Sequence, residues 1–136
     1  MAGRPRFERT PDGRRLVVSR TVDADSDAVW DLLTDTIRWP DWGPSVSGVR
    51  ARDRYIRAGT TGRVQVVGGP WIPFEVGTCR PYRWTWRVAG VPATAHRVEP
   101  RGADCLVAFE IPLVAAPYIL VCDRALDRID RLVARS

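Results

Sequence analysis

A single long amphipathic helix at the end of the chain constrains the fold more than any other feature. Over residues 116–134, apolar side chains recur at helical spacing and charged side chains occupy the other faces. A helix with one apolar stripe must bury that stripe against a partner. The rest of the chain therefore has to supply a surface that covers it. The apolar set is Tyr118, Val121, Cys122, Ala125, Ile129, Leu132 and Val133.

Short strand patterns separated by turn signals fill most of the chain before that helix. Glycine and proline breakers stand between them, as at 68–70 and 90–92. Links this short join antiparallel neighbours. The pattern predicts an α+β fold in which a curved antiparallel sheet of six or seven strands wraps around the C-terminal helix. We expect strands near 15–22, 46–52, 61–67, 72–80, 82–89, 93–100 and 104–113.

A shorter helix is expected after the first strand. Asp25 is a suitable N-cap, and apolar residues follow it at helical spacing. Pro40 disfavours helix at the residue before it, so this helix should end near Thr36. We expect residues 37–44 to form a tight turn that carries two tryptophans.

The length and composition fit one soluble domain. The chain has 136 residues, so residues 15–136 are expected to form a single domain, with residues 1–14 as an N-terminal arm or one half of a hairpin. No apolar run approaches the roughly 18 residues of a membrane span, and no signal-peptide core is present. The three cysteines match no metal or redox spacing. These features predict a cytoplasmic protein with reduced thiols and no integral membrane association.

The charge raises the question of nucleic-acid binding. The net charge is +5 and all 21 basic residues are arginine, so lysine-dependent chemistry is excluded. Strand alternation places charges of both signs on the outer face of the sheet, which predicts a solvated face and argues against nucleic acid as a partner. The expected outward residues are Arg63, Glu75, Arg83, Arg87, Arg97, Glu99 and Glu110.

The inward face of the sheet has a different composition. Alternation turns Phe74, Trp84, Trp86, His96 and Phe109 toward the helix. A lining that is mostly apolar with a few polar points is typical of small-molecule cavities. The sequence therefore predicts a hollow between sheet and helix that binds a small hydrophobic molecule. Plain filling of the core by these tryptophans is the alternative.

Metal and cofactor chemistry has little support. Asp31 and Asp35 share one helix face with Asp27, and we expect this acidic stripe to be solvated. The chain has one histidine and no cysteine cluster. We therefore expect neither a metal ion nor another cofactor.

Four short blocks carry a resemblance to a known group. They are VWDLLTD at 29–35, WPDW at 39–42, RWTW at 83–86 and AHRVE at 95–99. In this order, and with the long last helix, they resemble the SRPBCC superfamily over about residues 15–134. The closest resemblance is to its polyketide cyclase/dehydrase-like branch, which is related to START lipid-transfer domains and the birch-pollen allergen fold.

The resemblance implies a helix-grip fold. In that fold a seven-stranded sheet curls around the C-terminal helix, and two short N-terminal helices close one side. It also implies a deep cavity for lipids, polyketides or other hydrophobic ligands, with Trp39 and Trp42 at its mouth or as a plug. The family has no shared catalytic triad, so no active-site motif is carried over.

Several functions stay open at this stage. The first is a carrier or sensor of a lipid, polyketide or aromatic-type ligand. The second is a polyketide cyclase/aromatase or dehydratase, with His96 as acid/base and Tyr118 as helper. The third is a chaperone-partner or regulatory module. The oligomeric state, monomer or homodimer, is also open. The expected ligand-binding residues are Trp39, Trp42, Phe74, Val76, Trp84, Trp86, His96, Val98, Phe109, Tyr118 and Cys122.

Overall fold

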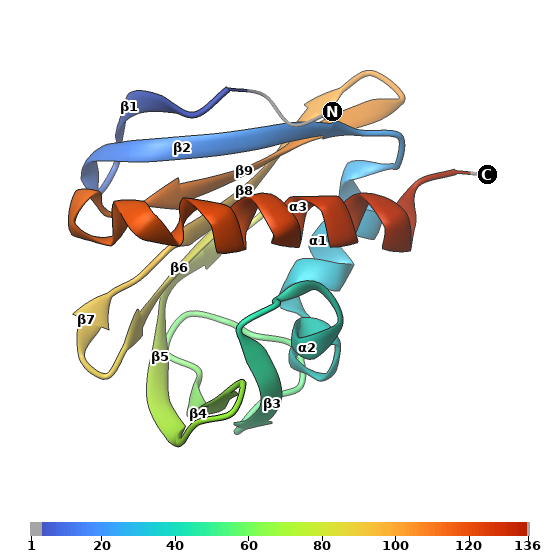
Figure 1. The fold of residues 1–136 in the computed structure, drawn as a ribbon. Helices are drawn as coiled ribbons and strands as arrows, with labels where there is room; N and C mark the ends of the chain where they lie inside the picture. Colours follow the sequence, from blue (N-terminus) through green and yellow to red (C-terminus); the bar gives the residue numbers. More distant parts are fainter. Residues whose placement is uncertain (1–3, 136) are drawn as a thin grey trace.

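One curved antiparallel sheet wraps around the last helix (Figure 1). The computed structural model describes residues 4–135, and within them the sheet has nine strands. The strand order is β1-β2-β9-β8-β6-β5-β4-β3, and β7 pairs with β6. The strands are β1 (Arg6–Thr10), β2 (Gly13–Val22), β3 (Val46–Ala51), β4 (Thr61–Val66), β5 (Trp71–Arg80), β6 (Arg83–Val88), β7 (Val91–Pro92), β8 (Ala95–Arg101) and β9 (Asp104–Ile111).

The expected α+β helix-grip architecture is confirmed, with more strands than expected. The additional strands are β1, which forms a hairpin with β2, and the two-residue β7. The first strand escapes the sequence pattern because it is an exposed edge strand with few buried side chains. The helical elements are α1 (Ser26–Thr34), the 3₁₀ turn η1 (Thr36–Arg38), α2 (Trp39–Trp42), the 3₁₀ helix η2 (Leu113–Tyr118) and α3 (Ile119–Val133).

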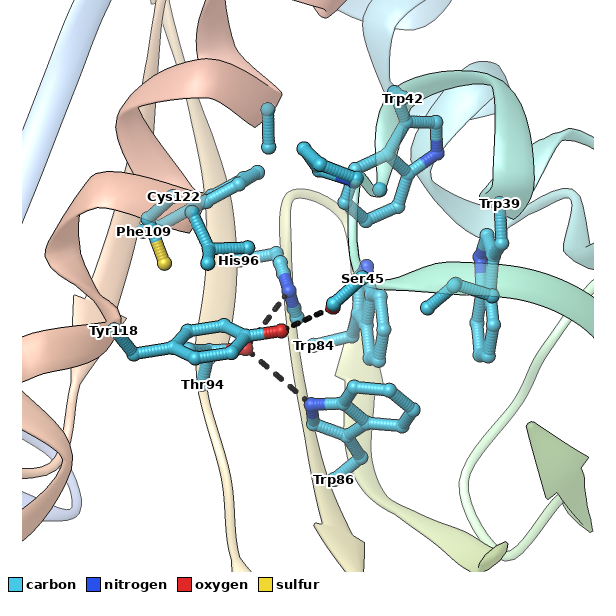
Figure 2. Close-up of a pocket in the computed structure, with 15 residues that line it drawn as sticks. Trp39, Trp42, Ser45, Trp84, Trp86, Thr94, His96, Phe109, Tyr118 and Cys122 are labelled. Carbon is cyan, nitrogen blue, oxygen red and sulfur yellow. Dashed lines mark hydrogen bonds between the residues drawn. The ribbon is translucent and has the colours of Figure 1, made fainter. Parts of the chain in front are cut away.

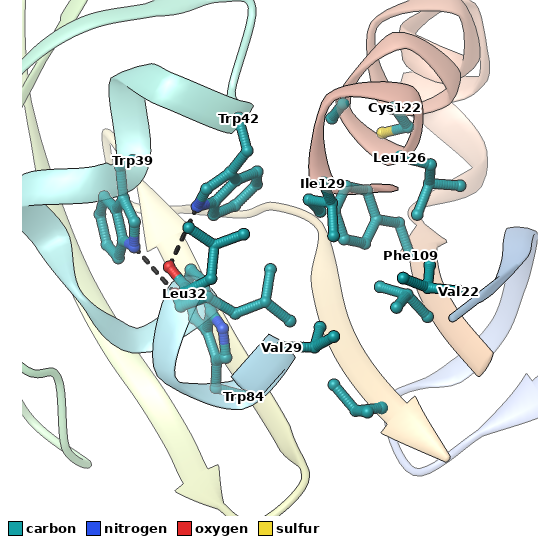
Figure 3. Close-up of a cluster of buried hydrophobic side chains, with 14 of the residues drawn as sticks. Val22, Val29, Leu32, Trp39, Trp42, Trp84, Phe109, Cys122, Leu126 and Ile129 are labelled. Carbon is teal, nitrogen blue, oxygen red and sulfur yellow. Dashed lines mark hydrogen bonds between the residues drawn. The ribbon is translucent and has the colours of Figure 1, made fainter. Parts of the chain in front are cut away.

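Helix α3 buries the middle of the stripe that its sequence predicts, whereas Tyr118 and Leu132 near its two ends are exposed. Cys122, Ala125 and Ile129, together with Leu126, which was not in the predicted set, are buried against the concave face of the sheet (Figure 3). The regular α-helix starts three residues later than expected. Pro117 has no backbone N–H to donate, and the preceding residues form a 3₁₀ helix instead.

Helices α1 and α2 are joined by side-chain hydrogen bonds. Trp39 Nε1 donates to the Leu33 carbonyl at 2.9 Å, and Trp42 Nε1 donates to the Leu32 carbonyl at 3.2 Å (Figure 3). These carbonyls lie in the last turn of α1, where the helix supplies no partner of its own. The tight turn expected at residues 37–44 is therefore wrong for most of its length, because residues 36–42 are helical and are fastened to α1.

Asp35 corrects one expectation about the acidic stripe. It was expected to be solvated, but it is 3% exposed. Arg54 donates to both of its carboxylate oxygens at 3.1 and 3.0 Å, and the Ile37 amide donates to one of them. The hydrogen bonds from Arg54 hold the pKa of Asp35 below its usual value.

A second correction concerns the outer face of the sheet. Glu110 is not solvated there, because only 2% of it is exposed. Arg83 donates to its carboxylate at 2.7 and 3.1 Å, and Arg97 donates at 2.9 Å. Asp12 and Glu8 from the N-terminal hairpin pair with the same two arginines. The hairpin thus covers this part of the face with an ion cluster.

The sheet opens between β6 and β8, and this opening positions the site. The two strands pair only at Arg83↔Arg97 and Trp84↔His96. Beyond Trp84, strand β6 pairs with β7 instead. The Trp86 side of β6 is therefore separated from β8 by residues 89–94.

Candidate functional site

Aromatic rings fill most of the hollow expected between sheet and helix. Trp39 and Trp84 stack with ring centroids 5.3 Å apart, and His96 stacks on Trp84 at 4.0 Å. Phe109 and Trp42 pack against His96 edge-on. The space left beside these rings is a cavity of about 40 Å³, shown in Figure 2. A volume of this size holds on the order of one to three water molecules, and it is well below the roughly 300 Å³ at which small-molecule sites start.

His96 is buried at the end of a short hydrogen-bond chain. Trp86 Nε1 donates to Thr94 Oγ1 at 3.4 Å, and Thr94 Oγ1 lies 3.1 Å from His96 Nε2 (Figure 2). Burial lowers the pKa of His96 from 6.5 to about 3. The imidazole is therefore neutral at pH 7 and accepts or donates one hydrogen bond through Nε2.

Tyr118 and Ser45 close the inner cavity on its open side. Their hydroxyl groups hydrogen-bond to each other across the space between the start of α3 and the segment before β3 (Figure 2). Burial raises the pKa of Tyr118, so its phenol is neutral and able to donate.

A larger apolar groove continues outward from this pair of hydroxyls. Its volume is about 310 Å³. It shares Ser45, Val46, Trp86, Thr94 and Tyr118 with the inner cavity, so the two spaces are adjacent. Its other lining residues are Val64, Gln65, Val66, Val88, Val91, Pro92, Ala93, Pro112 and Ala115.

The groove exists because β6 leaves β8. The β6–β7 hairpin and the residues after it, from Val88 to Thr94, form one wall. Val64 and Val66 of β4 form another, and the segment from Pro112 to Tyr118 forms a third. Ten of the fourteen lining residues are apolar, as in small-molecule sites.

The residues expected to bind ligand fall into two sets. One set surrounds the inner cavity, and only Trp86 and Tyr118 of that set reach the groove as well. Phe74, Val76 and Val98 lie in the buried core and line neither space. The residues around the inner cavity are Trp39, Trp42, Trp84, Trp86, His96, Phe109, Tyr118 and Cys122.

The groove itself was missed from sequence. Inward alternation indicated Val64 and Val66, and the breaker at 90–92 indicated a short turn between antiparallel neighbours. Neither pattern shows that β6 changes partner at this breaker or that η2 lies opposite it. A non-local feature of this kind carries no local sequence signal.

The described residues offer no alternative centre for metal chemistry. Within residues 4–135, no group of three or more histidine, cysteine or acidic side chains is arranged to hold a metal ion. The same part of the chain contains no helix long and apolar enough to cross a membrane. Cys79, Cys105 and Cys122 are free thiols.

Comparison with solved structures identifies the fold. XoxI from Bacillus cereus superposes with a TM-score of 0.68 at 12% identity, covering 86% of this chain and 93% of that one. CalU16 from Micromonospora echinospora gives 0.61 at 19% identity, covering 95% and 86%. Ms6760 from Mycobacterium smegmatis gives 0.62 at 15% identity, covering 93% and 95%. Identities this low establish a shared fold alone.

Comparison of sequences places the chain in a family. No curated protein matches it significantly. The family described as polyketide cyclase/dehydrase and lipid transport matches residues 14–120, which include most of the sheet, both N-terminal helices and all the residues of the groove. The resemblance seen in the sequence blocks is thereby confirmed: this chain belongs to the polyketide cyclase/dehydrase and lipid transport family.

Proposed function

We propose that the chain binds a small, largely apolar molecule in the groove between β4, β6, β7 and the start of α3. The observation that carries the proposal is the groove itself, with about 310 Å³ of space and an apolar lining. Small-molecule sites start at roughly 300 Å³. The volume therefore suits a compact ligand better than a long two-chain lipid.

A few polar groups stand where the groove meets the inner cavity. They are the hydroxyl groups of Ser45, Tyr118 and Thr94, together with the indole N–H of Trp86. A few polar groups within an apolar lining fix the orientation of a ligand. A ligand with one polar end, such as a carbonyl or hydroxyl group, could place that end here and its apolar body along Val64, Val66 and Val88.

The same geometry favours binding over acid–base catalysis. A general acid or base works best when its pKa is near the operating pH. His96 has a pKa of about 3 because it is buried, and its Nε2 atom is already engaged by Thr94. It also lies behind Tyr118 and Trp86, outside the groove. His96 therefore has a supporting role, which is to hold Thr94 and, through it, Trp86 in place.

The test is binding of an apolar fluorescent probe, 1-anilinonaphthalene-8-sulfonate, to the folded chain. We expect saturable binding that weakens at least tenfold in Ala115→Phe, because Ala115 lines the groove and a phenyl ring there occupies part of it. Ala116→Phe is the matched control, since Ala116 is adjacent but lines neither space. Its affinity should stay within twofold of wild type.

Two outcomes would contradict the proposal. One is absence of probe binding to a chain that unfolds cooperatively in urea. The other is equal weakening by both substitutions. A cytoplasmic location, which free thiols suit, stays a prediction, and the oligomeric state, monomer or homodimer, stays open.

A further inference from the structure

Four stretches of sequence that meet around the groove contain no charged side chain. They are residues 43–49, 64–74, 88–95 and 111–122. Each contributes lining residues to the groove. Charged residues make up 27% of the chain, so four such stretches converging on one opening mark a surface of distinct composition.

These stretches also carry most of the exposed apolar side chains. In the described part of the chain, ten large hydrophobic residues are exposed, and six of them belong to these stretches. Val114 is 91% exposed and Leu120 is 77% exposed. Clustered exposure of this kind marks an interaction surface, whereas scattered single residues do not. We call the cluster the apolar rim: Val67, Val91, Leu113, Val114, Tyr118 and Leu120.

Basic side chains border the apolar rim. Leu16 of β2 pairs with Ile111 of β9, so the β1–β2 turn extends alongside Leu113 and Val114. Figure 1 shows this turn, β7 and the start of α3 at one end of the molecule. Acidic residues also lie near this border: Asp12 is paired with Arg83, Glu8 and Glu75 lie opposite Arg15 and Arg87 in the strand register, and Asp123 and Asp127 lie beside Arg124 in α3. Within residues 4–135, five bordering arginines have no carboxylate within 4.0 Å: Arg9, Arg14, Arg15, Arg87 and Arg124.

We propose that the apolar rim docks on the surface of an anionic lipid bilayer, with the bordering arginines against the headgroups. Shallow insertion of apolar side chains beside arginines is how peripheral proteins hold anionic membranes. A second copy of this chain fits the rim less well. A symmetric contact there would bring the same unpaired arginines together. In the docked orientation the groove opens toward the acyl chains, so an apolar ligand passes into it without crossing water.

The test is co-sedimentation of the full chain with vesicles. One set contains equal phosphatidylglycerol and phosphatidylcholine, and the other contains phosphatidylcholine alone. We expect binding to the anionic vesicles, weaker binding in 0.5 M salt, and at least tenfold weaker binding to the neutral ones. Val114→Asp combined with Leu120→Asp should lower anionic-vesicle affinity at least tenfold.

A matched control separates the rim from general hydrophobicity. Ile37 and Leu132 are 63% and 42% exposed and lie outside the rim. Ile37→Asp combined with Leu132→Asp should leave vesicle binding within twofold of wild type. All four positions are exposed, and far-UV circular dichroism checks that each variant is folded.

Three results would overturn the proposal. They are failure of the wild-type chain to bind anionic vesicles, equal loss in both double variants, and a dimer in light scattering that Val114→Asp combined with Leu120→Asp converts to monomer. The last result would assign the rim to contact between copies. Binding of the fluorescent probe without vesicles should be unchanged in the rim variant, so failure of the docking proposal is distinguishable from failure of the groove.

Discussion

Replacing Glu110 by glutamine tests whether the ion cluster on the outer face holds the N-terminal hairpin to the sheet. The glutamate carboxylate is buried and accepts three hydrogen bonds from Arg83 and Arg97. The amide of glutamine has nearly the same shape but one acceptor oxygen and no charge. Its N–H₂ group faces guanidinium groups that are themselves donors.

The expected loss follows from what remains around the two arginines. Removing one partner of a buried ion pair costs about 3–5 kcal/mol. Here Asp12 still pairs with Arg83, and Glu8 and Glu99 still pair with Arg97. We therefore expect the lower end, about 3 kcal/mol of unfolding free energy. With a urea m-value of about 1.5 kcal/mol/M, the midpoint should fall by about 2 M.

Urea denaturation followed by circular dichroism at pH 7 measures this loss. The control is Glu99→Gln, which removes a partly exposed acid that pairs with Arg97 and Arg101. Exposed pairs contribute about 1 kcal/mol or less, so its midpoint should change little. The reasoning is refuted if Glu110→Gln unfolds within 0.5 M of wild type, or if the two variants lose equal stability.

Three further predictions follow from the site. Burial keeps the pKa of His96 at about 3 in the folded chain against 6.5 unfolded. The unfolded chain therefore binds the extra proton first, and the free energy of unfolding falls as the pH drops from 7 toward 3. Between pH 7 and pH 5 the loss is about 2 kcal/mol. Urea midpoints at both pH values should show this loss in wild type and not in His96→Gln. Burial raises the pKa of Cys122 to about 12. Ellman's reagent should therefore modify the less buried Cys79 first and Cys122 only on unfolding. Rapid labelling of Cys122 in the native chain would contradict its burial. Tyr118→Phe removes the hydrogen bond with Ser45 and should lower the free energy of unfolding by about 0.5–1.5 kcal/mol. An unchanged urea midpoint would mean that this hydrogen bond contributes nothing to stability.

The sequence indicates the fold well because the fold depends on periodicity. Alternation in β6, β8 and β9 turned Trp84, His96 and Phe109 inward, and the structure buries all three. Helical spacing in the last segment indicated the buried stripe of α3. Each of these patterns is local, and each is enforced by the cost of exposing apolar surface.

Predictions failed where a residue's environment comes from distant segments. Parity correctly put Glu110 on the outer face, but burial there comes from Arg83, Arg97 and a hairpin nearly a hundred residues earlier. Whether the hollow is open or filled by its own tryptophans could not be decided from sequence, and in the structure Trp39 lies in it, with its indole N–H donating to the Leu33 carbonyl at the end of α1. The larger apolar space lies beside the hollow, in the groove.

The central claim is that the groove binds a small apolar molecule, and the indole N–H resonances of the chain test it most directly. Of the six tryptophans, Trp86 lines the groove, while Trp30 and Trp71 line neither the groove nor the inner cavity. On titration with 1-anilinonaphthalene-8-sulfonate, ¹H–¹⁵N spectra should show a saturable shift of the Trp86 indole resonance, assigned by Trp86→Phe. The resonances of Trp30 and Trp71 should stay in place. A saturable shift at Trp30 or Trp71 with none at Trp86 would contradict the account.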